Sequence, residues 1–73
     1  MSTSGLVNTA ALNVRSGPAI TYSVTAVVYQ NQGGALIGRN ADSSWVKVRL
    51  VNGTVGWVNS AYIQTSTTLN SLP

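Results

Sequence analysis

Apolar and polar residues alternate with a period of two along most of this 73-residue chain. Such alternation is typical of half-buried β-strands, and no segment shows the apolar spacing of a helix. Leu12 and Val14 alternate with Asn13 and Arg15, and a Ser-Gly-Pro turn signal then ends the run. The pattern predicts six short strands, over residues 12–15, 24–29, 35–39, 45–51, 54–58 and 62–64, with one helical turn at 59–61.

The dipeptide Asn52-Gly53 predicts a β-hairpin between two of these strands, and the length of its loop decides which side chains share a face. A two-residue loop would place Val58 on the same face as Trp45 and Lys47. A three-residue loop would place Val46, Val48, Leu50, Gly56 and Val58 on one face, and Trp45, Lys47, Arg49, Val55 and Trp57 on the other. We predict the three-residue loop because it separates apolar from charged side chains better, with Val55 as the exception.

Five or six short antiparallel strands in so short a chain predict a small barrel, because a flat sheet of this size would leave one apolar face in water. The fold class is therefore all-β, with one helical turn before the last strand. We expect a flexible segment over residues 1–6, the barrel over 7–64, and a linker or tail rich in serine and threonine over 65–73. The predicted core contains Val46, Val48, Leu50 and Val58, together with Leu12 and Val14.

Two stretches of the sequence resemble the bacterial SH3 domain family. The run LNVRSGP, at residues 12–18, is the hallmark of that family, and WVKVRLVNGTVGWVNSAYI, at 45–63, is similar to its closing half. The resemblance covers about residues 7–64. It implies an SH3-like β-barrel, in agreement with the strand pattern. It also implies a module that is appended to secreted or envelope proteins, often cell-wall hydrolases, and that holds them on peptidoglycan.

The side chains that most enzymes and metal sites use are scarce in this chain. It contains no histidine, cysteine or glutamate, and Asp42 is its one carboxylate side chain. Paired-carboxylate hydrolysis, a histidine-based triad and a cluster of metal ligands are therefore excluded. A serine–lysine dyad is disfavoured because Lys47 lies in the middle of an exposed strand face. We expect a protein that is not an enzyme and that uses no cofactor or metal.

The charges limit the partners further. Four cations and one acid give a net charge of +3, and charged residues make up 7% of the chain. Four cations scattered along the sequence make a weak footprint for phosphates, so no nucleic-acid partner is expected. No apolar run is long enough to span a membrane. The resemblance implies an extracellular or envelope parent protein. Since the N-terminus lacks the features of a signal peptide, we expect the signal of that parent protein to lie outside this chain.

The predicted register yields a candidate binding surface. It places Trp45 and Trp57 on the outer face of the barrel, beside the cations and within reach of Tyr62. An exposed aromatic cluster next to cations indicates a contact surface rather than a core. The predicted ligand-binding residues are Trp45, Trp57, Tyr62, Arg15, Tyr22 and Arg49.

Each candidate also has a structural interpretation. Loops could cover the two tryptophans, and Arg15 could bind carbonyl groups of the following loop. Tyr22 could fix its own loop, and Arg49 could simply face solvent. A polyproline groove like that of eukaryotic SH3 domains is not expected, because about half of the aromatic ridges that such recognition needs are missing.

Two functions follow from these observations. The first is a non-catalytic module that binds peptidoglycan, through its glycan or its stem peptide, and so targets a parent protein to the cell wall. The alternative is a protein-interaction or self-assembly module that packs against a neighbouring catalytic domain or against other copies of itself. A hydrophobic content of 44% with few charges favours this alternative, as does the uncharged run at 24–28, which could offer a strand edge.

Overall fold

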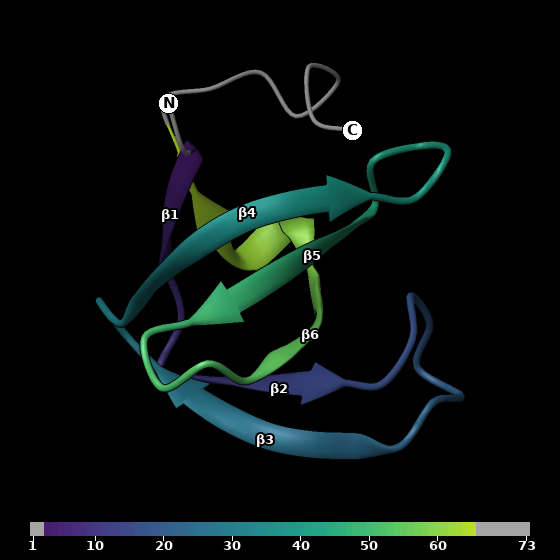
Figure 1. The fold of residues 1–73 in the computed structure, drawn as a ribbon, viewed down its shortest axis with the longest axis horizontal. Coiled ribbons are helices and arrows are strands. Elements are labelled where there is room, and N and C mark those ends of the chain that lie inside the picture. Colours follow the sequence, from purple (N-terminus) through teal and green to yellow (C-terminus); the bar gives the residue numbers. More distant parts are fainter. Residues whose placement is uncertain (1–2, 66–73) are drawn as a thin grey trace.

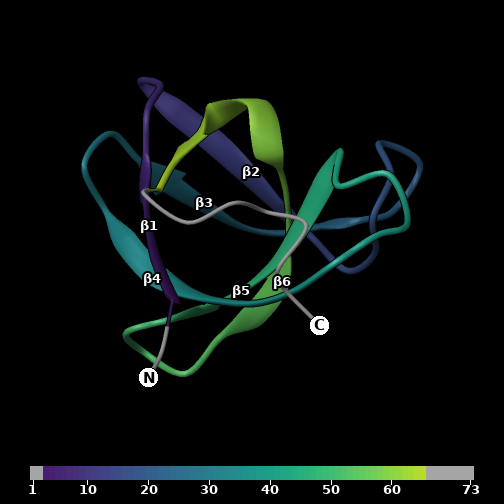
Figure 2. The same ribbon diagram turned by 90° about the horizontal axis from the view of Figure 1, so that it is seen from above.

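Seven antiparallel strands and one short 3₁₀ helix make up the computed structural model, which describes residues 3–65 (Figures 1 and 2). The elements are β1 (Thr3–Val7), β2 (Ala11–Arg15), β3 (Val24–Tyr29), β4 (Gly33–Arg39), β5 (Trp45–Leu50), β6 (Val55–Asn59), η1 (Ser60–Tyr62) and β7 (Ile63–Gln64). The strands follow the order β3-β2-β6-β5-β4-β1-β7 in one strongly bent sheet. The predicted all-β barrel with one helical turn before its last strand is confirmed.

The β5–β6 hairpin has the predicted three-residue loop. Val46 lies opposite Val58, and Lys47 lies opposite Trp57. The backbone N–H of Leu50 donates to the carbonyl of Thr54 over 2.8 Å, and the N–H of Gly53 donates back to the carbonyl of Leu50 over 2.9 Å. Gly53 has φ 90°, a value that side-chain-bearing residues rarely adopt, so glycine suits this position.

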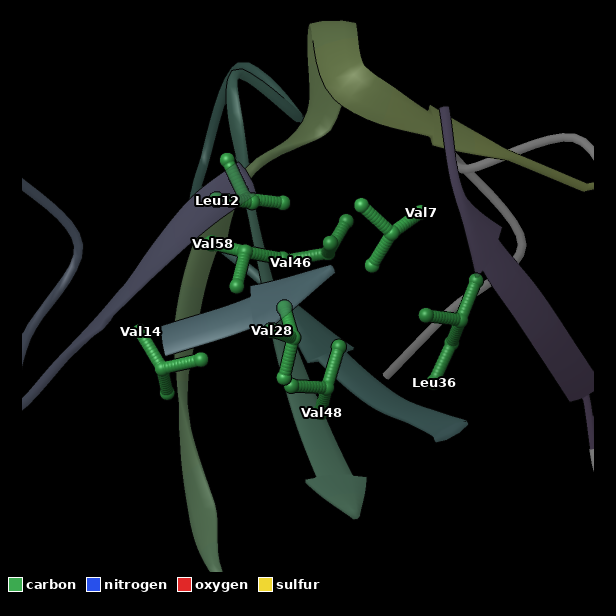
Figure 3. Close-up of a cluster of buried hydrophobic side chains, with 8 residues drawn as sticks. All are labelled: Val7, Leu12, Val14, Val28, Leu36, Val46, Val48 and Val58. Atoms are coloured by element: carbon green, nitrogen blue, oxygen red, sulfur yellow. The ribbon is translucent and has the colours of Figure 1, made fainter. Parts of the chain in front are cut away.

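Valines and leucines from both halves of the bent sheet form the core (Figure 3). The buried cluster consists of Val7, Leu12, Val14, Val28, Leu36, Val46, Val48 and Val58, with Ala26, Leu50 and Ile63 packed against it. Five of the six predicted core residues are therefore buried, and the sixth, Leu50, is half-buried at the edge of the cluster. The alternation of buried and exposed residues along each strand follows from the strand period of two.

The N-terminal segment differs from the expectation of a flexible stretch over residues 1–6. Thr3–Val7 is strand β1, which pairs with β4 and β7. A side chain at Gly5 would lie 2.8 Å from Cγ2 of Ile63, so the bare backbone at Gly5 permits the close approach of β7. The stretch Thr-Ser-Gly carries no apolar alternation, and its pairing with distant strands leaves no local signal in the sequence. The predicted tail over 66–73 lies outside the described residues.

Candidate functional site

A surface groove runs between β2 with its following loop on one side and the start of β5 with η1 on the other. Its volume is about 330 Å³, at the lower end of the range for sites that bind small molecules. The lining residues are Thr9, Ala11, Leu12, Asn13, Arg15, Ile20, Trp45, Asn59 and Tyr62. The groove thus combines two aromatic rings with amide, hydroxyl and guanidinium groups.

A hydrogen-bonded corner holds the aromatic wall of this groove in place. The backbone N–H of Trp45 donates to Oδ1 of Asn40 over 3.0 Å. Both the backbone N–H and the hydroxyl of Ser60 donate to the carbonyl of Ser44, over 3.0 and 2.9 Å. Asn59 caps η1, because its Oδ1 accepts from the N–H of Ala61. Trp45 and the helix that carries Tyr62 are therefore tied together through the loop at 40–44.

Arg15 fixes the opposite wall. Its Nη1 donates to the carbonyls of Ile20 and Tyr22, over 3.1 and 3.0 Å, which fastens the loop at 16–23 onto β2. The other guanidinium N–H groups of Arg15 make no hydrogen bond within residues 3–65. Arg15 therefore has the structural role that the sequence left open, and it also retains donors for a ligand.

Replacement of Arg15 by lysine should loosen the loop at 16–23. Both bonds come from Nη1 of Arg15, and a lysine side chain is one atom shorter, so its ammonium group falls short of the two carbonyls. We therefore expect a loss of about 1 kcal/mol in the free energy of unfolding. The local effect should be larger. Hydrogen exchange should accelerate at the backbone N–H groups of Ser16 and Tyr22, which bond within this loop. Unchanged exchange at both sites would show that Arg15 does not hold the loop.

Tyr22 lies beside the groove without lining it. A side chain at Gly17 would lie 2.5 Å from Cδ1 of Tyr22, so the ring packs directly on the bare backbone of Gly17. The side chain of Tyr22 is nonetheless 48% exposed. The structural interpretation, in which this tyrosine fixes its own loop, accounts for its position.

The structure places only part of the expected aromatic cluster in the groove. Trp45 and Tyr62 line the groove, whereas Trp57 and Arg49 do not. Trp57 lies on the outer face of the sheet, opposite Lys47 on β5 and Arg15 on β2. Both tryptophans are on the outer face as predicted, but each is half-buried rather than exposed. Trp45 lies opposite Asn59, two residues along β6 from Trp57, so the two tryptophans are diagonal neighbours on this face although one of them lines the groove.

Ile20 is a groove residue that the sequence analysis missed. It is 75% exposed and stands in the loop that Arg15 fastens. The available signal was that Ile20 is the one large aliphatic residue in the polar stretch at 16–23. An exposed apolar side chain that lines a groove is typical of a residue that contacts a ligand.

Asp42 organises the loop beside Trp45. Its Oδ1 accepts from the hydroxyl of Ser44 over 2.7 Å and from the backbone N–H of Ser44 over 3.1 Å. These bonds, the hydroxyl bond above all, lower the pKa of Asp42 below its ordinary value of 3.8. The lowered pKa means that the charged carboxylate stabilises the folded loop above pH 3.8. This contribution is lost as the pH falls through the pKa of the folded state.

Replacement of Ser44 by alanine should therefore raise the pKa of Asp42. An NMR titration of the Asp42 carboxyl group in both proteins measures the shift. We expect the pKa of the variant to lie closer to 3.8, because the strongest bond to the carboxylate is gone. An identical pKa in the two proteins would contradict the hydrogen-bonded geometry of this loop.

The groove lining offers aromatic faces and hydrogen-bond donors, and it contains no histidine, cysteine or carboxylate side chain. Among residues 3–65 no group of histidine, cysteine, aspartate or glutamate side chains could hold a metal ion. No helix in that part of the chain is long and apolar enough to cross a membrane. The aromatic faces can stack on rings or on apolar edges, and the amide and guanidinium groups can donate hydrogen bonds.

A small bent barrel, with an aromatic groove between a long loop and a 3₁₀ helix, defines an SH3-like module. The model of the bacterial SH3 domain family matches residues 10–64, and the chain belongs to this family. A curated relative is the protein named "Putative N-acetylmuramoyl-L-alanine amidase YrvJ" of Bacillus subtilis (strain 168). The two are 36% identical over 55 residues, which are 75% of this chain and 10% of the relative. The chain thus spans about a tenth of the relative's length.

Proposed function

We propose that this chain is a non-catalytic module that binds peptidoglycan through the groove and thereby holds a secreted or envelope protein on the cell wall. The observation that carries the proposal is the groove itself, in which the rings of Trp45 and Tyr62 face the donors of Arg15 and Asn13. The rings would stack on sugar faces or on apolar parts of the stem peptide. The free N–H groups of Arg15 would bind a stem-peptide carboxylate through charge-assisted hydrogen bonds.

The name of the curated relative supports this proposal. That protein is named as an N-acetylmuramoyl-L-alanine amidase, and the similarity covers about a tenth of its length. A segment of that size fits an accessory domain, so this chain would serve a neighbouring catalytic domain in its own parent protein. One groove of this size supports weak binding, and repeated copies of the module would raise the avidity.

A pull-down on purified sacculi tests the proposal with a matched pair of variants. Tyr62→Ala removes a groove ring that is 46% exposed, and Tyr29→Ala removes a ring on β3 that is 57% exposed. We expect Tyr62→Ala to weaken binding about five- to thirtyfold, as for a contact worth about 1–2 kcal/mol. Tyr29→Ala should bind like the unmodified protein. Equal retention of both variants would reject the groove as the binding site.

The free edge of β3 supports the alternative function of protein interaction or self-assembly. Within residues 3–65 β3 pairs with β2 alone, and it exposes Val24, Val27 and Tyr29. However, Thr25 forms a bulge in its pairing, and the side chain of Gln32 accepts from the N–H of Tyr29 over 2.7 Å. Both features shorten the edge that another strand could use. Light scattering at high concentration distinguishes the two functions, since strand addition between copies predicts dimers and the groove predicts monomers.

A further inference from the structure

Three of the four cations stand on one face of the sheet, although they are scattered along the sequence. Lys47 on β5 lies directly opposite Trp57 on β6, and Trp57 lies opposite Arg15 on β2. Arg49 lies two residues from Lys47 and opposite Val55. Directly opposite residues of antiparallel strands leave the sheet on the same side. These five residues, Arg15, Lys47, Arg49, Val55 and Trp57, form what we call the cationic face.

No acid on the cationic face offsets these charges within residues 3–65. Asp42, the one carboxylate side chain, lies in the loop at 40–44 and accepts hydrogen bonds from Ser44. The fourth cation, Arg39, pairs in register with the core residue Val46, so it leaves the sheet on the other side. The cationic face therefore concentrates the positive potential of the module and attracts anions.

Trp57 stands between two of these cations in the strand register. Neighbouring strands are about 4.8 Å apart, so the backbones of Arg15 and Lys47, which flank β6, are about 10 Å apart with Trp57 between them. Trp57 is half-buried, which leaves part of the ring accessible. An indole face stacks on the apolar face of a sugar ring, and the flanking cations bind carboxylates. This order of cation, ring and cation fits a sugar with acidic groups on either side.

We propose that the cationic face is a second binding surface, which shares Arg15 with the groove and extends from it across β6 and β5, and that its ligand is a linear acidic polysaccharide. One sugar ring stacks on Trp57, and carboxylates of the chain bind Arg15 and Lys47. Arg49 extends the contact along the strand. Three cations make too small a footprint for a nucleic-acid duplex, whose affinity depends on many phosphate contacts. A carbohydrate ligand uses the ring and the charges together.

Fluorescence of Trp57 tests this surface directly. In a Trp45→Phe background Trp57 is the one remaining tryptophan, and oligogalacturonate serves as the acidic probe. We expect the probe to change the emission, and added salt to weaken the binding. A neutral cello-oligosaccharide of the same length should leave the emission unchanged. No response to oligogalacturonate would overturn the proposal.

A matched pair of arginine substitutions locates the contact. Arg49→Gln removes a charge from the cationic face, and Arg39→Gln removes the same charge from the other side of the sheet. We expect Arg49→Gln to weaken binding about three- to fivefold and Arg39→Gln to weaken it less than about twofold. Thermal unfolding verifies that both variants are folded. Equal losses would show that net charge, rather than this face, attracts the probe.

Two further probes test the chemical class of the ligand, and one variant tests whether its binding needs the aromatic wall of the groove. Oligoglutamate carries carboxylates without sugar rings, and a short DNA duplex carries phosphates. Binding of either as tight as that of oligogalacturonate would overturn the assignment to a polysaccharide. Tyr62→Ala removes a ring of the groove, and it should leave the affinity for oligogalacturonate unchanged. A large loss in that variant would show that the acidic probe binds in the groove instead.

Discussion

Gly56→Ala should lower the thermal midpoint of unfolding by about 10–20 °C. Gly56 faces the core from β6, opposite Val48, at the place where β6 crosses β2. A side chain there would overlap Cγ1 of Val14 and lie 3.0 Å from the carbonyl oxygen of Arg15. Val14 is fully buried and the carbonyl belongs to the backbone, so neither can move aside without cost. Overpacking of this kind costs about 1–3 kcal/mol, a large share of the stability of so small a domain.

Gly53→Asn is the matched control for this substitution. No atom lies within 4 Å of a side chain placed at Gly53, and asparagine tolerates positive φ better than most residues. We expect this variant to lose less than about 1 kcal/mol. Differential scanning calorimetry compares the two variants under one condition. A midpoint for Gly56→Ala equal to that of the unmodified protein would contradict the close packing of β6 on β2.

Val58→Ala should destabilise the protein by about 2 kcal/mol, whereas Val55→Ala should cost less than about 0.5 kcal/mol. The two valines stand on one strand, and the chemical change is the same in both variants. Val58 is 1% exposed and packs in the core, while Val55 is 45% exposed on the outer face. Denaturation by urea measures both free energies of unfolding.

This pair of variants also decides between the two hairpin registers. A two-residue loop would shift the pairing of β6 with β5 by one residue, and such a shift moves every side chain of β6 to the other face of the sheet. Val55 would then face the core and Val58 the solvent. A greater loss of stability for Val55→Ala than for Val58→Ala would therefore contradict the three-residue loop.

The fold was largely predictable from the sequence because the core strands show a clear alternation of apolar and polar residues. In β5 the charged residues Lys47 and Arg49 alternate with the valines, and burial of an unpaired charge is costly, so the facing of the strand follows. Strand β1 escaped prediction for the opposite reason. Its strand conformation depends on backbone pairing with β4 and β7, which are distant in the sequence.

The residue types of the candidate site could be predicted from the sequence, but which of these residues line the same groove could be predicted only in part. Trp45, Tyr62 and Arg15 do line one groove. Trp45 lines the groove and Trp57 does not, because the groove is formed with β2, its following loop and η1, and no pattern of residues along one strand reports these neighbours. Ile20 enters the groove because Arg15 fastens its loop, a contact between residues that have no periodic relation.

The central claim is that the groove binds peptidoglycan, and an NMR titration with soluble muropeptides tests it most directly. The indole N–H of Trp45 makes no hydrogen bond within residues 3–65, so a ligand in the groove should shift its resonance. We predict saturable shifts at Trp45, Ile20, Asn13 and Tyr62, with little change at Tyr29 on β3. Saturable shifts confined to β3, or none at millimolar concentrations of the fragments, would contradict the claim.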